Sequence, residues 1–150
     1  MAAHVASQII AAVGSRLASV ADVYYVPLAA VPIDNLPAII VQDIDDETAQ
    51  ALGKGPVQEQ HRLSFELFGV VAHAESGFQT EAGELRASIE RALMAAADDI
   101  SLDGLCKPGL RRIGAEFRVD AESLQKPVGG WAMKFNCVYS LKTDAPDTAI

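Results

Sequence analysis

Two stretches of the chain repeat apolar residues at the spacing of an amphipathic helix. The first covers about residues 3–20, where the repeat runs from Val5 to Val20. The second covers residues 77–97, begins at Phe78 and is the stronger of the two. Because residues three and four positions apart share one face of a helix, we expect two helices, each with a single apolar stripe.

Five other segments have the pattern of β-strands. Apolar and polar residues alternate over 62–72, 112–119 and 131–142, whereas 23–26 is rich in β-formers and 38–41 is a short apolar run. Successive residues of a strand face opposite sides of the sheet, so the alternating segments predict half-buried strands. The second half of 62–72 is apolar at almost every position, and we expect it to be buried or covered by a partner.

A long polar segment, residues 43–60, separates two of these strands. Its sequence is DIDDETAQALGKGPVQEQ. Structureless loops longer than about 12–15 residues are uncommon in compact domains and usually bind something or order on assembly. We therefore expect either a protruding β-arm or a mobile flap here. Farther along the chain, the glycine pair before Trp131 is predicted to mark a turn.

The order of the predicted elements is helix, strand, strand, loop, strand, helix, strand, strand. Strands grouped in pairs, with two helices available to cover one face, are typical of an α+β fold. We expect a mostly antiparallel sheet with both helices packed on one face and a long β-arm or flap. The predicted organisation is a single α+β domain over residues 1–143, with a protruding loop at 43–60 and a flexible tail at 144–150.

The composition is that of an ordinary globular protein and limits the choice of partners. The chain has 150 residues, of which 50% are apolar and 21% charged, and its net charge is −8. An acidic surface disfavours non-specific binding to phosphate backbones. No segment approaches the roughly 18 consecutive apolar residues of a membrane span, and the N-terminus lacks the basic region of a signal peptide. Two cysteines do not make a disulfide framework, so we interpret the chain as cytosolic with reduced thiols.

The strongest cluster of potential ligands is the acidic start of the long polar segment. Its carboxylates belong to Asp43, Asp45, Asp46 and Glu47. A calcium loop needs glycine at its sixth position and glutamate at its twelfth, but counting from Asp43 those positions hold Thr48 and Lys54. The GKG sequence around Lys54 lacks the rest of a phosphate-binding loop. We therefore interpret the segment as a solvated face.

No arrangement of histidines or cysteines indicates catalysis. The histidines are His4, His61 and His73, and they have no metal-ligand spacing. Cys106 with a histidine would make a nucleophile–base pair, but nothing in the sequence places the two together, and no nucleophile elbow occurs. The sequence predicts no catalytic, cofactor-binding or metal-binding residue, and we expect a protein without enzymatic activity.

Two features of the chain are candidates for contact with a partner. Three arginines accompany one predicted strand, and they have three interpretations: contact with the acidic segment of a neighbouring copy, contact with another partner, or ordinary surface charge. Trp131 is interpreted as a core residue, with an interface anchor as the alternative. The candidate contact residues are Asp45, Asp46, Glu47, Lys54, Arg111, Arg112 and Arg118.

The chain resembles the tail terminator (tail completion) proteins of long-tailed bacteriophages and prophages. The resemblance lies in the N-terminal helix ending in RLASV, in DNLPAIIV and in the long polar segment that follows. It continues in HRLSFELFGVVAHA, in the helix ELRASIERALMAA, in LDGL and in the closing strand GGWAMKFNCVYSLK. It covers most of the chain and rests on the arrangement of these phrases.

This resemblance implies a structural virion protein. Such proteins form a ring, commonly a hexamer, on the head-proximal end of the tail tube, where the ring stops tube polymerisation and offers a surface for head-tail joining. The implied partners are other copies of the chain, the tail tube protein and a head-completion or neck protein. DNA would cross the channel without specific binding, and neither a cofactor nor a membrane would take part. The implied location is the virion, after assembly in the bacterial host cytoplasm.

Other functions remain open at the level of the sequence. A neck or head-closure protein, or a tail tube subunit, would be built in a similar way. A small-molecule-binding or enzymatic α+β domain would need a deep pocket with convergent polar groups. An interaction module of another kind is the last alternative.

Overall fold

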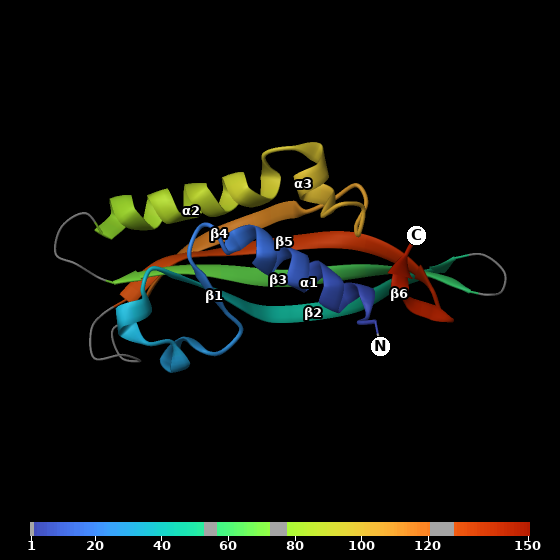
Figure 1. Cartoon of the computed structure of the whole chain (residues 1–150), viewed down its shortest axis with the longest axis horizontal. Helices are drawn as coiled ribbons and strands as arrows, with labels where there is room; N and C mark the ends of the chain where they lie inside the picture. Colours follow the sequence, from blue (N-terminus) through green and yellow to red (C-terminus); the bar gives the residue numbers. More distant parts are fainter. Residues whose placement is uncertain (1, 53–56, 73–77, 121–127) are drawn as a thin grey trace.

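Helices on one side and a long, curled sheet on the other form the two layers of the molecule (Figure 1). The computed structural model describes residues 2–52, 57–72, 78–120 and 128–150. The helical elements are α1 (Val5–Leu17), the 3-10 turns η1 (Leu28–Ala30) and η2 (Ile33–Asn35), α2 (Phe78–Met94) and α3 (Ala97–Ser101). The strands are β1 (Asp22–Tyr24), β2 (Ala38–Leu52), β3 (Gln58–Ala72), β4 (Arg111–Asp120), β5 (Val128–Lys142) and β6 (Ala145–Ala149).

The strands form one sheet in the order β1-β2-β3-β5-β4, and β6 pairs with the end of β5. Every pairing is antiparallel except that of β1 with β2, which is parallel. This architecture confirms the predicted α+β class with a mostly antiparallel sheet. The central strands β3 and β5 pair along their whole length, from Gln58 opposite Lys142 to Ala72 opposite Val128.

Both long helices lie on the same face of the sheet, which we call the helix face. Each buries the stripe that its periodicity predicts, including Val5, Ile9 and Val13 of α1. Phe65 of β3 and Phe135 of β5 stack beneath them with ring centroids 5.7 Å apart. α1 is shorter than predicted at its start, because the ring of His4 accepts a hydrogen bond from the backbone N–H of Ala6 and caps the helix there.

The opposite face of the sheet has a second, smaller core at one end. Its buried members are Val31, Ala38, Ile40, Phe68, Val70, Val128 and Ala132. Leu28 and Leu36, from the segment that contains η1 and η2, pack against them. This segment explains why the second half of the predicted strand at 62–72 is apolar on both faces: the chain itself covers it.

The long polar segment is not a loop in its described part. β2 and β3 continue through it as a hairpin, with pairs from Asp45 opposite Ser64 to Leu52 opposite Gln58. The loop prediction at 43–60 was wrong for these residues and the alternative, a β-arm, is correct. In Figure 1 the hairpin extends past the body of the sheet. Strand pairing is made by backbone groups, which every residue type offers except proline, so a polar sequence suffices.

The glycine pair Gly129–Gly130 lies inside β5 and does not mark a turn. A Cβ atom on Gly130 would overlap the carbonyl oxygen of Gly69, and one on Gly129 would lie 2.6 Å from the carbonyl oxygen of Arg118. The prediction of a turn was wrong because glycine serves here to let neighbouring strands approach closely.

The predicted flexible tail at 144–150 also has a different structure. Ala145–Ala149 form β6, and the backbone N–H of Ile150 donates to the carbonyl oxygen of Ser140. The side chain of Gln8 donates to the carbonyl oxygen of Asp147 at 2.7 Å, which ties β6 to α1. The sequence offered no apolar pattern for this strand, because its partners are backbone groups.

Candidate functional site: the two open edges of the sheet

The outer edge of β2 is open over most of its length. β1 pairs with β2 only at Ala38–Ile40, and beyond it no strand in the described part of the chain lies on that side. The strand then carries a bulge, since Gln42 pairs with Glu66 but the next pair is Asp45 with Ser64. Asp43 within the bulge has a φ of 53°, a left-handed conformation that aspartate tolerates better than most residues. The bulge resets which side chains face the helices.

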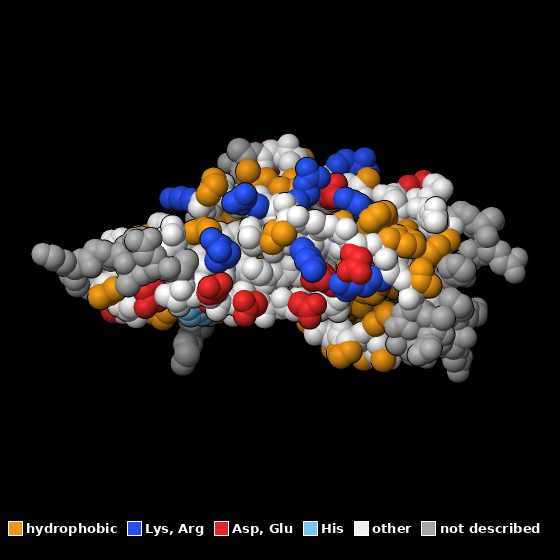
Figure 2. All heavy atoms as spheres, turned by 180° about the vertical axis from the view of Figure 1, so that it is seen from behind, with side chains coloured by type: hydrophobic (Ala, Val, Ile, Leu, Met, Phe, Trp, Pro, Cys, Tyr) orange, Lys and Arg blue, Asp and Glu red, His pale blue; other side chains and the backbone are white. Residues whose placement is uncertain are grey.

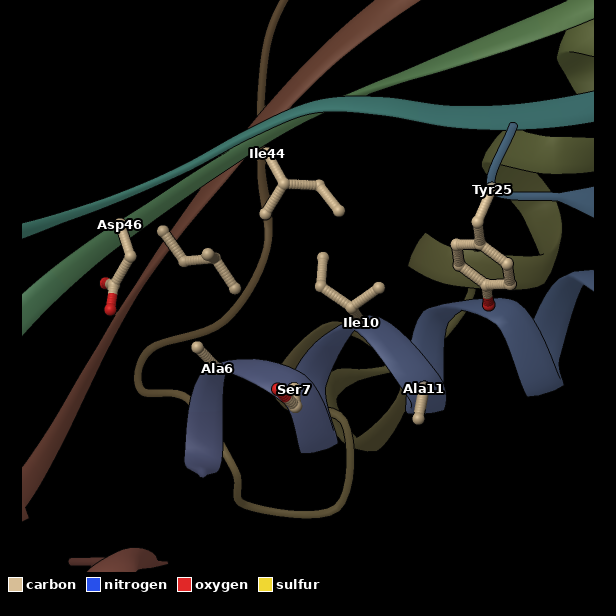
Figure 3. A pocket seen from close by; sticks show the side chains of 8 residues that line it. Ala6, Ser7, Ile10, Ala11, Tyr25, Ile44 and Asp46 are labelled. Atoms are coloured by element: carbon tan, nitrogen blue, oxygen red, sulfur yellow. The ribbon is translucent and has the colours of Figure 1, made fainter. Parts of the chain in front are cut away.

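An apolar groove follows this edge on the helix face, between α1 and β2. Its volume is about 420 Å³, and it is lined by Ala6, Ser7, Ile10, Ala11, Tyr25, Ile44, Asp46 and Leu63. Figure 3 shows Ile10 from α1 and Ile44 from β2 pointing toward each other across it, with Tyr25 at one end. Tyr25 is 55% exposed and Ile44 is 50% exposed. These are large apolar surfaces for a monomer to leave in water.

Gly14 of α1 leaves room for the side chain of Tyr25 at the end of the groove. A Cβ atom at this position would overlap the hydroxyl group of Tyr25. A glycine inside a helix costs about 1 kcal/mol relative to alanine, so the sequence alone marks it only as a weakness. The structure gives it a reason, because it lets the tyrosine ring lie against the helix.

A polar cluster around the buried His61 and Tyr139 joins the root of the arm to the groove. The hydroxyl of Tyr139 on β5 donates to Asp46 on β2 at 2.7 Å. The ring of Tyr139 stacks on His61 of β3 with centroids 4.9 Å apart. His61 lies between two carboxylates, with Nδ1 3.4 Å from Asp46 and Nε2 2.9 Å from Glu59. Burial and the hydrogen bond to Asp46 raise the pKa of the Tyr139 hydroxyl, so it stays protonated. The cluster ties three strands together where the arm begins.

The other open edge is β4, which pairs only with β5 among the described strands. Its two most exposed apolar side chains are Ile113 at 56% and Val119 at 55%. Arg111 is exposed and has no ion-pair partner within the described residues. Arg112 reaches across to Glu90 of α2 at 3.0 Å. This edge therefore combines basic, acidic and apolar groups, since Glu116 and Asp120 also belong to β4.

Arg118 forms an ion pair with the buried Glu66 on the opposite face of the sheet. Its Nη1 donates to Glu66 of β3 at 2.6 Å, and Glu116 lies 3.1 Å from its Nη2. Glu66 is only 2% exposed and also accepts a hydrogen bond from Gln42 at 2.8 Å. The carboxylate of Glu66 raises the pKa of Arg118. Sequence reasoning missed Glu66, because its polar position in an alternating strand suggests an ordinary wet face.

The predicted contact residues lie at two opposite margins of the sheet and do not meet within one subunit. Asp45 and Glu47 are exposed on β2, and the three arginines belong to β4, with β3 and β5 between. Three of the predicted residues have partners in their own subunit, since Asp46 bonds Tyr139, Arg118 bonds Glu66 and Arg112 pairs with Glu90. Lys54 lies outside the described residues.

On the opposite face of the sheet, acidic and basic side chains are separated in the same way. Figure 2 shows acidic side chains in a row along the lower margin, which is the side of β2 in Figure 1, and basic side chains above them. Asp45 and Arg111 even share one row of the sheet, because Asp45 pairs with Ser64, Ser64 with Asn136, and Asn136 with Arg111. This row therefore has an exposed acidic residue at its β2 end and an exposed basic residue at its β4 end.

The remaining candidates for chemistry have structural surroundings. The thiol of Cys106 lies near the carbonyl oxygens of Ile100 and Ser101, at 3.7 and 3.5 Å, and beside Cys137 in the core. The pKa of the Cys137 thiol is raised by its contact with Cys106 and by its burial. Within the described residues, no three side chains of histidine, cysteine, aspartate or glutamate are grouped so as to hold a metal ion.

Trp131 lies half-buried on the helix face and packs against the core. Phe117 contacts its ring edge-on at a centroid distance of 5.3 Å. The guanidinium of Arg86 on α2 lies over the ring at 4.5 Å, within the range of a cation–π contact. The indole is thus held by its own subunit.

Comparison of the sequence with protein-family models and with curated proteins found no match. None of the helices in the described part of the chain is both long enough and apolar enough to span a bilayer.

Proposed function

We propose that this chain is a structural virion protein that forms a ring on the head-proximal end of a phage tail tube, as its resemblance to the tail terminators implies. The observation that supports this best is the pair of different open edges at the two margins of one sheet, with Asp45 and Glu47 exposed on one and Arg111 exposed on the other. A protein whose two different edges attract each other associates head to tail, and head-to-tail contacts close into a ring when the rotation allows it.

In this proposal the protein works by surface complementarity and makes or breaks no bond. Identical copies, commonly six in the family, close the ring, and the ring offers one surface to the tail tube protein and another to a head-completion or neck protein. DNA passes through the central channel. The net charge of −8 suits a channel that does not retain a polyanion.

The β2–β3 arm has a natural place in this assembly. It projects beyond the body of the sheet (Figure 1), and in its described part the side chains of Asp45, Glu47 and Gln58 are polar and exposed, so these side chains do not need burial to be compatible with water. An arm of this kind can reach a neighbouring subunit or the tube and gain backbone hydrogen bonds there.

The test of this proposal is assembly of the full chain. Sedimentation velocity over a range of protein concentrations should detect a discrete oligomer, and negative-stain electron microscopy should reveal rings. Purified tail tubes incubated with the protein should stop elongating when fresh tube protein is added. A protein that stays monomeric at every concentration and leaves tube elongation unchanged would overturn the proposal.

The same open edges would also suit a neck or head-closure ring or a tail tube subunit. Labelling the protein in intact particles and locating the label by electron microscopy separates these positions. The groove between α1 and β2 favours a small-molecule site less, because the carboxylate of Asp46 at its margin is already bonded to Tyr139.

A further inference from the structure

We propose that the open edge of β2 and the groove beside it receive an extended segment of another protein, in which apolar residues alternate with lysine or arginine. The segment would add a strand to the sheet, with its apolar side chains in the groove and its basic side chains on the opposite face. This inference goes beyond the proposed function and does not depend on it, because the whole site lies within one subunit.

The short strand β1 marks the position that the added strand would take. β1 pairs with β2 over three residues, as far as Ile40. The chain then bends at Val26, and Pro27 has no N–H with which to continue the pairing. Farther along β2, β3 is the only neighbouring strand in the described part of the chain. The unpaired N–H and C=O groups of an edge strand are a template for an extended peptide, so this edge suits a strand better than a compact ligand.

Two hollows adjoin the place that β1 leaves empty. One is the groove of about 420 Å³, and the other, of about 400 Å³, is lined by residues 25–27 and 41–44. Tyr25 and Ile44 line both hollows, and Figure 3 shows them at the groove. Val26, beside them, is 41% exposed. An added strand would cover this apolar surface, and the groove would accept the apolar side chains on one face of the strand.

The two faces of β2 determine which residue types the segment needs. Ile44 and Asp46 line the groove on the helix face, whereas Asp45 and Glu47 are exposed and lie on the opposite face, because alternate residues of a strand face opposite sides. β2 has four carboxylates between residues 43 and 47 and no basic residue along its whole length. Unlike charges on neighbouring strands attract each other. The segment should therefore present basic side chains to Asp45 and Glu47.

A second copy of the chain that stands level with the first does not supply this segment. Through β5 and β3, residues 116–118 of β4 are level with residues 38–40 of β2, where β1 already occupies the edge. Arg111, the first residue of β4, is level with Asp45, so no residue of β4 is level with the part of β2 beyond it. Two β2 edges would bring like charges together, which opposes their pairing. The occupant is therefore a different protein.

The first experiment measures binding of labelled peptides to the full chain by fluorescence anisotropy at low salt. The probes are seven-residue peptides of the pattern KxKxKxK, in which x is valine, leucine, isoleucine or phenylalanine. At least one should bind about tenfold more tightly than a peptide of the same composition with its lysines in one block, because only alternation gives each face one residue type. The acidic analogues ExExExE should not bind. If no alternating peptide exceeds its block control, or if the acidic analogues bind equally well, the proposal is overturned.

Methylation of the peptide backbone tests whether the segment joins the sheet. A strand added to an edge directs the N–H groups of only alternate residues toward its neighbour. N-methyl groups on one alternate set of residues should therefore weaken binding about tenfold or more, whereas those on the other set should have little effect. Bound peptide should also slow hydrogen exchange of the backbone at residues 43–48. Equal effects of the two methylated sets, or unchanged exchange at these residues, would contradict strand addition.

An apolar substitution in the protein locates the groove. Ile44→Ser should weaken binding of the best peptide about fivefold or more, because it removes apolar surface that both hollows share. Ile113→Ser is the matched control, since Ile113 is a similarly exposed isoleucine at a bulge of the other edge strand, β4. The control should bind the peptide like wild type. Equal binding by the two variants would place the peptide elsewhere and overturn the proposal.

A charge-removing pair tests the acidic face. Asp45→Asn combined with Glu47→Gln should weaken binding about tenfold at low salt and less at high salt. Glu81→Gln combined with Glu84→Gln removes two exposed carboxylates from α2 and is the control for the change in net charge. If both double variants weaken binding to the same extent, the attraction comes from net charge alone and the proposed site is wrong.

Two further measurements distinguish the possible occupants. Thermal melts of each variant check that the fold is unchanged. Sedimentation velocity of wild type and Ile44→Ser without peptide tests for a second copy at the groove. If Ile44→Ser weakens self-association while no peptide binds, a second copy is the occupant and the proposal is wrong. Failure of the chain to form rings or cap tubes would count against the proposed function only, because peptide binding is measured on the single subunit.

Discussion

The two faces of the sheet achieve burial in different ways. On the helix face, α1 and α2 cover a continuous apolar core in which Phe65 and Phe135 stack. On the opposite face, the described part of the chain covers one end with the short segment that contains η1 and η2, and the same face carries charges such as Glu66 and Arg118. The first face has the features of a core that holds the monomer together. The second is a charged surface, and its charged side chains serve a purpose other than packing.

This difference indicates which part of the molecule determines its folding stability and which part tolerates substitution. Apolar burial of side chains contributes about 1.5–3 kcal/mol each, and the helix face contains most of the buried apolar residues. Exposed ion pairs contribute at most about 1 kcal/mol each. Substitutions on the helix face should therefore change folding, whereas those at the charged margins should change association. The following predictions test this division, from the largest expected effect to the smallest.

Truncation of the central aromatic stack should have the largest effect. Phe135→Ala should lower the free energy of unfolding by about 3–5 kcal/mol, because the cavity is enclosed by two helices and two strands that cannot collapse into it. Phe68→Ala on the opposite face should cost less, about 2–3 kcal/mol, since the short segment over it can move inward. Urea denaturation of both variants provides the comparison. Equal losses would mean that the two faces are equally rigid.

Removal of the buried charge pair should have an intermediate effect. Arg118→Met leaves the Glu66 carboxylate buried with Gln42 as its remaining partner, and an unpaired buried charge is costly. Because Arg118 is itself partly exposed, we expect a loss of about 2–3 kcal/mol, less than for a fully buried pair. The matched variant Glu66→Gln keeps a hydrogen-bonding side chain and should lose only about 1 kcal/mol. If Arg118→Met proved as stable as wild type in urea, Glu66 would have to be solvated.

The smallest effect should come from the polar cluster at the root of the arm. Tyr139→Phe removes the hydrogen bond to Asp46 and should cost about 1 kcal/mol near neutral pH. The folded state raises the pKa of Tyr139 above its unfolded value. The corresponding stability is complete below about pH 10 and is lost as the pH rises through the raised pKa, by about 1.4 kcal/mol per pH unit.

The measurement is the urea unfolding free energy of wild type and Tyr139→Phe between pH 8 and pH 11. Wild type should lose stability faster than the variant above about pH 10. Parallel curves for the two proteins would show that the tyrosine hydroxyl is no better buried in the folded state than in the unfolded one.

The sequence predicted the layers of the fold well where side chains alternate between a solvent-exposed and a buried face. The helical stripe beginning at Phe78 and the alternation through β5 both correspond to elements that bury their apolar positions. The prediction from sequence failed where an element is stabilised by backbone hydrogen bonds and not by apolar side chains. The polar part of β2 and the strand β6 have no apolar pattern.

The candidate site was predictable only in part, for a related reason. Composition alone identified an acidic segment and a group of arginines. It did not reveal that Asp46 and Arg118 bond to Tyr139 and Glu66 within the subunit. Nor did it reveal that the bulge at Asp43 orients the side chains that follow. A one-residue shift moves every later side chain to the other face, and such shifts depend on strand pairing.

The sequence by itself thus determined which segments have a buried face, because burial requires apolar residues at the spacing of a helix or a strand. Only the tertiary structure decided how far β2 and β3 extend, which edges stay open, and that Asp45 and Arg111 lie at opposite ends of one row. The physical reason is that backbone hydrogen bonds are the same for nearly all residues. They can extend a strand through any polar sequence once its neighbour is in place.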